Sequence, residues 1–166
     1  MNCVSDIAAH NGIIKTLCPM PNQKVLVTAC DKQISLWDLV SMTSIGTLKG
    51  HKDEIRCLER GTNSLVSAGR STTADPSIFV WDLRSTSPIE SLEVHSDIYS
   101  IKLMPNDYEI YAGNSQKFVK YLNIKDKSSL DLSPPHFDTV TCLSSVGRTL
   151  ISGSKDKTLR FWDLNS

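Results

Sequence analysis

The segment Ile78-Phe79-Val80-Trp81-Asp82-Leu83 belongs to a pattern that occurs four times along the chain and decides its fold. In each copy, apolar and β-branched residues lead to a Trp-Asp pair or to its substitute, which is typical of a short strand that ends at a turn. The steps between the Trp positions are 44, 41 and 40 residues. The other three copies are Ile34-Ser35-Leu36-Trp37-Asp38-Leu39, Val119-Lys120-Tyr121-Leu122-Asn123-Ile124 and Leu159-Arg160-Phe161-Trp162-Asp163-Leu164. A nearly constant period of this length indicates a repeat protein.

A histidine precedes each copy by 26 to 30 residues, and the four copies use all four histidines, His10, His51, His95 and His136. Between the histidine and the Trp position lie two further short β-type runs, such as 55–58 and 64–67. A fourth run precedes the histidine, as in 44–48 and 89–94 and, by the same pattern, in 3–8. Each period therefore predicts four strands.

Four strands in about 40 to 45 residues, with a histidine and a Trp-Asp pair at fixed places, resemble the blade of a WD40 β-propeller. The resemblance covers nearly the whole chain, and it is strongest in Gly50-His51 with Trp81-Asp82 and in Ser152-Gly153-Ser154-Lys155-Asp156 with Trp162-Asp163. It predicts an all-β WD40 β-propeller of four blades, either partial or unusually small. We expect one repeat domain over 1–166, with repeats at about 3–39, 44–83, 89–124 and 130–164.

Three repeats also share an aspartate before the third strand and a Ser or Thr on the second. In the family that the chain resembles, Asp, His, hydroxyl and indole groups form a hydrogen-bonded network inside the blade. A hydrolase triad uses similar residues, but it is a single constellation with an oxyanion hole, whereas this set recurs. We expect structural tetrads of His10, Thr28, Asp31 and Trp37; His51, Ser67, Asp75 and Trp81; and His136, Ser152, Asp156 and Trp162.

The third repeat departs from this pattern. It has Leu122-Asn123 in place of Trp-Asp and Gln116 in place of the turn aspartate, so His95 lacks its usual partners. A weakened blade and a specialised binding surface are the two interpretations. We favour degeneracy, because degenerate repeats are common in the family.

Composition argues against several other classes of protein. Eighteen basic residues balance eighteen acidic ones without long runs of either sign, which disfavours binding to nucleic acid or anionic lipid. No apolar stretch approaches the roughly 20 residues of a membrane span, and the N-terminus does not resemble a secretory signal. Five cysteines without a C-x-x-C pair suggest neither a disulfide framework nor a zinc site. We expect a cytoplasmic protein, with the nucleus not excluded, that has no cofactor, metal site or catalytic motif.

A rim of the propeller is the expected binding surface, because loops on a rigid scaffold often carry binding residues. By resemblance, the wider family uses the rim where the first strand of each blade begins. An ordinary solvated role suits any single residue there, but as a group they suit a polar peptide or a folded protein partner. The rim residues are Lys15, Glu54, Arg56, Asp97, Tyr99, Thr139, Thr141 and Lys155. An enlarged turn over 69–77, which contains Arg70, could extend this surface or be an uninvolved loop.

The number of blades raises the question of ring closure. Pairing 3–8 with the strand that ends at Trp162 would complete a fourth blade. WD40 propellers mostly have seven blades, however, and four wedges of that shape would leave roughly 150 degrees open, with apolar faces exposed. Either the ring is strained shut, or the missing blades come from elsewhere. We expect first a fragment or short form of a longer protein, and second a pair of copies that forms one eight-bladed ring.

The expected function is that of a non-enzymatic scaffold or adaptor. Two alternatives are substrate recognition for a ubiquitin ligase and reading of a histone tail. A third is a cargo or regulatory tail of a kinesin-like protein. Three segments resemble the propeller tail of certain kinesins, namely 39–51, 80–84 and the stretch from Pro134-Pro135-His136-Phe137-Asp138 to Ser152-Gly153-Ser154-Lys155-Asp156.

Overall fold

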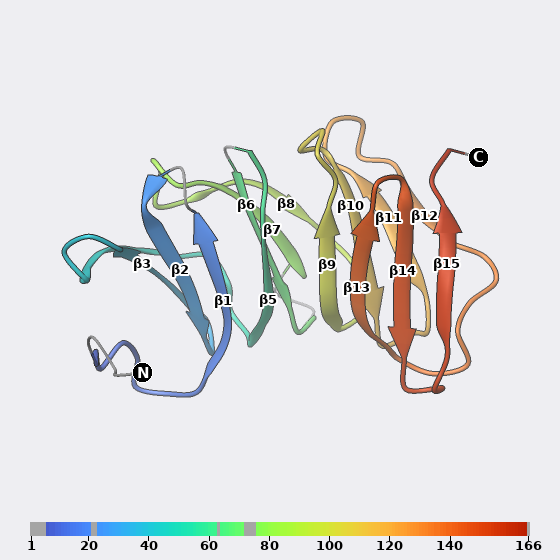
Figure 1. Cartoon of the computed structure of the whole chain (residues 1–166), viewed down its shortest axis with the longest axis horizontal. Helices are drawn as coiled ribbons and strands as arrows, with labels where there is room; N and C mark the ends of the chain where they lie inside the picture. Colours follow the sequence, from blue (N-terminus) through green and yellow to red (C-terminus); the bar gives the residue numbers. More distant parts are fainter. Residues whose placement is uncertain (1–5, 21–22, 63, 72–75, 166) are drawn as a thin grey trace.

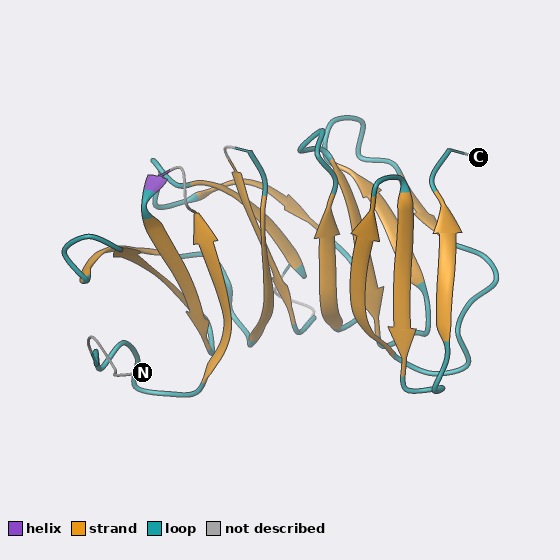
Figure 2. Ribbon diagram, in the orientation of Figure 1, coloured by secondary structure: helices purple, strands orange, loops and turns teal. Residues whose placement is uncertain are grey.

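Four antiparallel sheets stand side by side in the computed structural model, which describes residues 6–20, 23–62, 64–71 and 76–165 (Figure 1). We call these sheets blades 1 to 4 in chain order. Strands pair with their neighbours in sequence, and loops and turns join them (Figure 2). The strands are β1 (Ile14–Met20), β2 (Val25–Cys30), β3 (Gln33–Asp38) and β4 (Thr43–Leu48) in blade 1; β5 (Ile55–Arg60), β6 (Ser64–Gly69), β7 (Ile78–Asp82) and β8 (Pro88–Leu92) in blade 2; β9 (Ile98–Leu103), β10 (Glu109–Asn114), β11 (Val119–Asn123) and β12 (Ser129–Asp131) in blade 3; and β13 (Val140–Val146), β14 (Thr149–Ser154) and β15 (Leu159–Asp163) in blade 4.

The core consists of three apolar layers, one at each junction between neighbouring blades. Alternate residues of a strand point to opposite sides of its sheet, so the two faces of a blade serve two different junctions. Val27 and Ile34 of blade 1 pack with Trp81 of blade 2, and Ile78 of blade 2 packs with Ile110 of blade 3. The third layer joins blades 3 and 4 in the same way. The first strands of the blades, β1, β5, β9 and β13, pack against one another in that order.

Polar contacts also join blades 2 and 3 at the edge where their first strands end, and we call this set of contacts the clasp. Lys102 on β9 forms an ion pair with Glu59 on β5. Asp107, in the loop after β9, accepts hydrogen bonds from the backbone N–H of Thr62 at 2.9 and 2.8 Å. This clasp adds to the apolar layer between the two blades.

The predicted closure of the fourth blade is wrong for the structure that is described. Among the described residues, blade 4 has three strands, and β15 pairs with β14 alone. Residues 6–8, the described part of the predicted strand 3–8, form no strand, and 3–5 lie outside the described residues. The physical reason is distance, because blades 1 and 4 lie at opposite ends of the array (Figure 1). Residues 6–8 therefore do not reach β15.

The described residues hold neither a candidate membrane-spanning helix nor a candidate metal site. No helix there is both long and apolar enough to cross a membrane. In the same part of the chain, His, Cys, Asp and Glu side chains form no group of three or more that could hold a metal ion.

We predict that the junction layers dominate stability. Ile78→Ala removes a fully buried side chain between blades 2 and 3 and should lower the free energy of unfolding by about 2 to 5 kcal/mol. Ile89→Ala on β8 is the matched control, because Ile89 is exposed, and it should change stability by less than about 0.5 kcal/mol. Urea unfolding followed by circular dichroism measures both values, and equal losses would contradict this account.

Candidate functional site: a polar rim

Blade 4 shows how the repeated polar residues are held. His136 precedes β13, and its Nε2 lies 2.8 Å from Ser152 Oγ, which also accepts a hydrogen bond from Trp162 Nε1 at 2.9 Å. The other ring nitrogen, Nδ1, lies 2.9 Å from Asp156 Oδ2. A chain in which Trp162 donates to Ser152, Ser152 to His136 and His136 to Asp156 satisfies every one of these groups.

Asp156 links this network to the turn between β14 and β15. Burial alone would raise its pKa, but hydrogen bonds from Thr158, the backbone of Phe137 and His136 outweigh burial and lower the pKa well below its usual range. Its Oδ1 accepts from the Thr158 N–H at 2.9 Å, beside Lys157 in the left-handed region with a φ of 69°. The same carboxylate therefore holds the turn and the histidine.

Blade 1 contains the hydroxyl part of the network. Thr28 Oγ1 lies 2.6 Å from His10 Nε2 and accepts from Trp37 Nε1 at 2.9 Å. The structure gives no hydrogen bond between Asp31 and His10, although both residues are described. Asp31 instead accepts a weak hydrogen bond from the Cys30 thiol, at 3.7 Å.

Blade 2 has the same shared hydroxyl. Ser67 Oγ lies 2.7 Å from His51 Nε2 and accepts from Trp81 Nε1 at 2.8 Å. Asp75, the expected fourth member, lies outside the described residues, as does part of the enlarged turn over 69–77. The His51 ring also lies edge-on to the Phe79 ring, with the ring centroids 4.5 Å apart.

Blade 3 has a different internal structure. Ala112 and Leu122 take the places of the hydroxyl residue and the tryptophan, and both are buried among apolar side chains. His95 is exposed. Asn114 stabilises the turn after β10, because its Oδ1 accepts from the backbone of Gln116 at 3.0 Å and of Phe118 at 3.1 Å. Apolar packing replaces the hydrogen-bonded network in this blade.

The first strand of every blade begins with a β-bulge. The register with the second strand shifts between Ile14 and Thr16, and it shifts at corresponding places in the other three blades. A bulge leaves one residue unpaired and can redirect its side chain. The bulged residues are Lys15, Arg56, Tyr99 and Thr141. Four of the residues expected on the rim thus occupy one repeated structural position.

A second repeated position lies just before these strands. The carbonyl of Glu54 accepts from the Arg70 N–H at 2.8 Å, and that of Asp97 accepts from the Ser115 N–H at 3.0 Å. The carbonyl of Thr139 likewise accepts from the Lys155 N–H at 3.0 Å. In blades 2, 3 and 4 these bonds tie the start of the first strand to the end of the second strand, and so fix the backbone of the rim there.

Ion pairs connect the side chains of the rim across three blades. Lys15 Nζ lies 3.0 Å from Glu54 Oε1, and Arg56 Nε lies 3.1 Å from Glu54 Oε2. Arg56 also reaches Asp97 Oδ2 through Nη1, at 3.0 Å. Hydrogen bonds from Lys15 and then Arg56 lower the pKa of Glu54, so this carboxylate stays charged at neutral pH. Burial opposes the charge of Arg56, but its two carboxylate partners raise its pKa.

Tyr99 extends this chain toward blade 4. The Arg56 guanidinium lies 4.5 Å from the centre of the Tyr99 ring, and Lys155 Nζ lies 5.8 Å from it. The structure thus connects six of the eight predicted residues, and we call this set the polar rim: Lys15, Glu54, Arg56, Asp97, Tyr99 and Lys155. Thr139 and Thr141 lie beside it on blade 4, where Thr141 Oγ1 donates to the Gly153 carbonyl at 3.3 Å.

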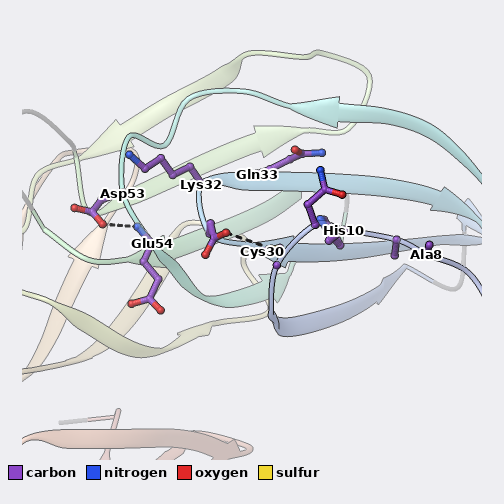
Figure 3. Close-up of a pocket in the computed structure, with 11 residues that line it drawn as sticks. Ala8, His10, Cys30, Lys32, Gln33, Asp53 and Glu54 are labelled. Carbon is purple, nitrogen blue, oxygen red and sulfur yellow. Dashed lines mark hydrogen bonds between the residues drawn. The ribbon is translucent and has the colours of Figure 1, made fainter.

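A pocket of about 600 Å³ adjoins the polar rim at blade 1. Figure 3 shows Lys32, Gln33, Asp53 and Glu54 around it, with the backbone N–H of Glu54 bonded to Asp53 at 2.7 Å. Sequence reasoning missed Lys32, Gln33 and Asp53. The available signal was the position of Lys32 in the β2–β3 turn, of Gln33 at the start of β3 and of Asp53 just before Glu54. Because the pocket carries both charge signs and backbone groups, it suits a polar chain segment.

Comparisons with known proteins match this geometry. The family model described as WD domain, G-beta repeat matches residues 1–38, 42–82 and 128–163. Mitochondrial division protein 1 of Aspergillus terreus is 32% identical over 97% of this chain and 23% of that protein. Mitochondrial division protein 1 of Saccharomyces cerevisiae is 29% identical over 82% of this chain and 16% of that protein. The CCR4-associated factor 4 homolog of Candida glabrata is 27% identical over 96% of this chain and 22% of that protein.

The chain therefore spans less than a quarter of the length of these three curated relatives. A solved structure, that of the computationally designed Ika4 protein, superposes with a TM-score of 0.82 at 24% identity. The superposition covers 96% of both chains. At this level of identity the likeness concerns the fold alone, and it agrees with the array of four sheets.

We predict that the shared hydroxyl in blade 2 is a major polar contribution to stability. Ser67→Ala removes the hydroxyl that the buried His51 Nε2 and Trp81 Nε1 share, and it should lower the free energy of unfolding by about 1 to 3 kcal/mol. Ser91→Ala, at an exposed position of the same blade, should change it by less than about 0.5 kcal/mol. Chemical unfolding followed by tryptophan fluorescence measures both values. An unchanged free energy of unfolding in Ser67→Ala would show that this network does not stabilise the blade.

His10 gives a prediction for pH. Burial lowers its pKa from the usual 6.5, although the charge of Asp31 opposes this effect. The folded state therefore binds a proton at His10 less readily than the unfolded state does. The stability that depends on neutral His10 is present above about pH 6.5, and it is lost as the pH falls through the lowered pKa. The melting temperatures of the wild type and His10→Gln, measured from about pH 8 to about pH 5, should converge as the pH falls. Parallel curves would contradict the prediction.

Proposed function

Because the chain belongs to the WD40 repeat family, we propose that it is a non-enzymatic scaffold or adaptor that binds a protein or peptide partner on its polar rim. The main observation is the connected row of charged and aromatic side chains from Lys15 to Lys155, placed at repeated positions on adjacent blades. Rigid placement of such groups is the feature that a recognition surface needs.

The contacts within the rim hold its side chains in place before a partner binds. Arg56 is held by two carboxylates and by the Tyr99 ring, so its long side chain has already lost much of its freedom. A partner that contacts it loses less conformational entropy on binding than it would with a mobile arginine. Arg and Tyr are also among the residues that most often dominate the binding energy of interfaces.

The chemistry of the rim favours a polar partner of mixed charge. Lys155 faces the Tyr99 ring and has no carboxylate partner among the described residues, so it suits an acidic group of the partner. Asp53 and Glu54 border the adjoining pocket and suit basic or N–H groups. We propose an extended peptide segment or a protein loop that runs along the rim from this pocket toward blade 4.

The relatives suggest the setting. Two of those described above are called mitochondrial division protein 1, and we propose that this chain acts as the interaction module of a protein of that kind, in the cytoplasm. The resemblance to kinesin tails rests on three short segments and stays a prediction. Recognition of ubiquitin ligase substrates is one alternative, and reading of histone tails is another, which the experiment below distinguishes.

The experiment selects peptides from a displayed random library on the wild-type chain and then measures their affinity for variants. Changing four residues of the rim to alanine should weaken binding at least about tenfold, because Arg56 and Tyr99 are the expected anchors. The rim variant is Glu54→Ala, Arg56→Ala, Asp97→Ala and Tyr99→Ala.

A matched control changes the same four residue types elsewhere. It combines Glu90→Ala, Arg84→Ala, Asp131→Ala and Tyr108→Ala, whose side chains form ion pairs or cation–π contacts away from the rim. Binding by this control should stay within about twofold of the wild type. Equal losses in both variants, or unchanged binding by the rim variant, would remove the proposed surface. Selection of modified histone peptides alone, from an added histone set, would support the reader alternative.

A further inference from the structure

The two faces of a blade differ, and each face has the same role at every junction. We call the side of a blade that packs on the following blade its forward face, and the side that packs on the preceding blade its back face. In blade 1 the forward face contains Val27, Ala29, Ile34 and Leu36. The back faces of the later blades contain Ile55, Leu58, Leu65 and Trp81 in blade 2; Ile98, Ile101, Ile110 and Leu122 in blade 3; and Val140, Leu143, Leu150 and Trp162 in blade 4.

Blade 1 carries the same pattern on its back face, where no blade covers it. Cross-strand pairing aligns Leu17, Leu26 and Trp37 with the covered residues of the later blades. Ile14 is 44% exposed, whereas Ile55, Ile98 and Val140 at the same position are 0% exposed. An apolar groove of about 360 Å³ opens on this face, lined by Ile7, Ile14, Leu17, Leu26, Trp37 and Met42 among others.

Blade 4 carries the complementary pattern on its forward face, also uncovered. Leu159 is 65% exposed, whereas Ile34 and Ile78 at the same position are 0% exposed and Val119 is 1% exposed. Phe161 is 67% exposed, whereas Leu36 at its position is buried. The array of four described blades therefore presents two uncovered apolar faces, and each one matches the face that the other type meets inside the molecule.

The packing at a covered junction shows the fit that the open faces would make. A side chain added at Gly113, on the forward face of blade 3, would come within 2.7 Å of Val140 Cγ1, so Val140 occupies that space. Gly153 holds the same place in blade 4, and Ile14 holds the place of Val140 in blade 1. Blade 1 can thus meet blade 4 as blade 4 meets blade 3.

The outer edge of blade 4 points to the same arrangement. In blades 1 and 2, the third strand pairs with a fourth whose last residue lies three positions before the next histidine, and this pairing sets Leu48 beside Ile34 and Leu92 beside Ile78. β15 has no such partner among the described strands. Ile7 lies three positions before His10, and it borders the open groove of blade 1.

We propose that a second copy of this chain packs head to tail on the first, with the back face of its blade 1 on the forward face of blade 4. Ile14 of one copy then covers Gly153 and Leu159 of the other, and Ile7 lies beside Leu159 at the edge of β15. Every molecule carries both faces, so the second junction can form between the same two copies and close an eight-bladed ring.

A second copy accounts for both faces at once. Single apolar patches of this kind on soluble proteins mark interaction sites, but they do not by themselves identify the occupant. Here the residue pattern that covers each type of face is known, because three junctions inside the chain pair the same two patterns. Asp38 also lines the groove of blade 1, but its carboxylate already accepts hydrogen bonds from the backbone N–H groups of Val40 and Ser41, at 2.8 and 2.7 Å.

The first experiment measures the mass of the whole 166-residue chain by sedimentation across the micromolar range. We expect twice the 18.4 kDa of a single chain, with dissociation on dilution. Ile14→Asp and Phe161→Lys should each weaken association by roughly 100-fold or more, because each places a charge in an apolar junction. Ile89→Lys, which adds a charge at an exposed position of β8 away from both faces, should leave association unchanged.

A mixing experiment then tests the head-to-tail arrangement. Ile14→Asp and Phe161→Lys chains, each monomeric alone, should associate when combined, because one junction is then unaltered and the other brings Asp and Lys together. Circular dichroism verifies that both variants are folded. A single-chain mass for the wild type, or dispersal by only one of the two variants, would overturn the proposal; the first outcome would mean that further blades or another partner cover these faces.

Discussion

A single buried hydroxyl group, shared between a histidine and a tryptophan, is the constraint on which each regular blade depends. Thr28, Ser67 and Ser152 each accept from an indole N–H and lie within 2.8 Å of a histidine nitrogen. The indole belongs to the third strand, and the histidine belongs to the loop before the first strand. One hydroxyl oxygen on the second strand therefore holds the third strand and this loop in place. Because buried polar groups are costly when unpaired, the network also specifies one register.

In three blades, that constraint also helps to position the polar rim. The histidine of blades 1, 2 and 4 holds the loop from which the first strand starts, whereas the bulge at that start is present in every blade, including blade 3, where His95 is exposed. Arg56 and Tyr99 owe their proximity to this repetition, since equivalent positions of adjacent blades are neighbours. Internal packing and the arrangement of the polar rim therefore have a common structural origin.

Sequence reasoning identified the fold because the strand period, the histidines and the Trp-Asp pairs all recur locally. It placed Glu54, Arg56, Asp97 and Tyr99 on one rim, but it could not predict that they pair, since Arg56 and Asp97 lie 41 residues apart and meet only through blade geometry. It also could not predict that Asp31 does not bond to His10. The closure of blade 4 was wrong because pairing rules do not include the distance between the two ends of an open array.

The clasp between blades 2 and 3 has a mechanical consequence. Arg56 and Asp97 join these blades at one edge, while Lys102 with Glu59, and Asp107 with the Thr62 backbone, join them at the other. Contacts at both edges oppose rotation of blades 2 and 3 relative to each other, so these two blades should move as one rigid unit. Relative motion of the blades should then be largest for blades 1 and 4.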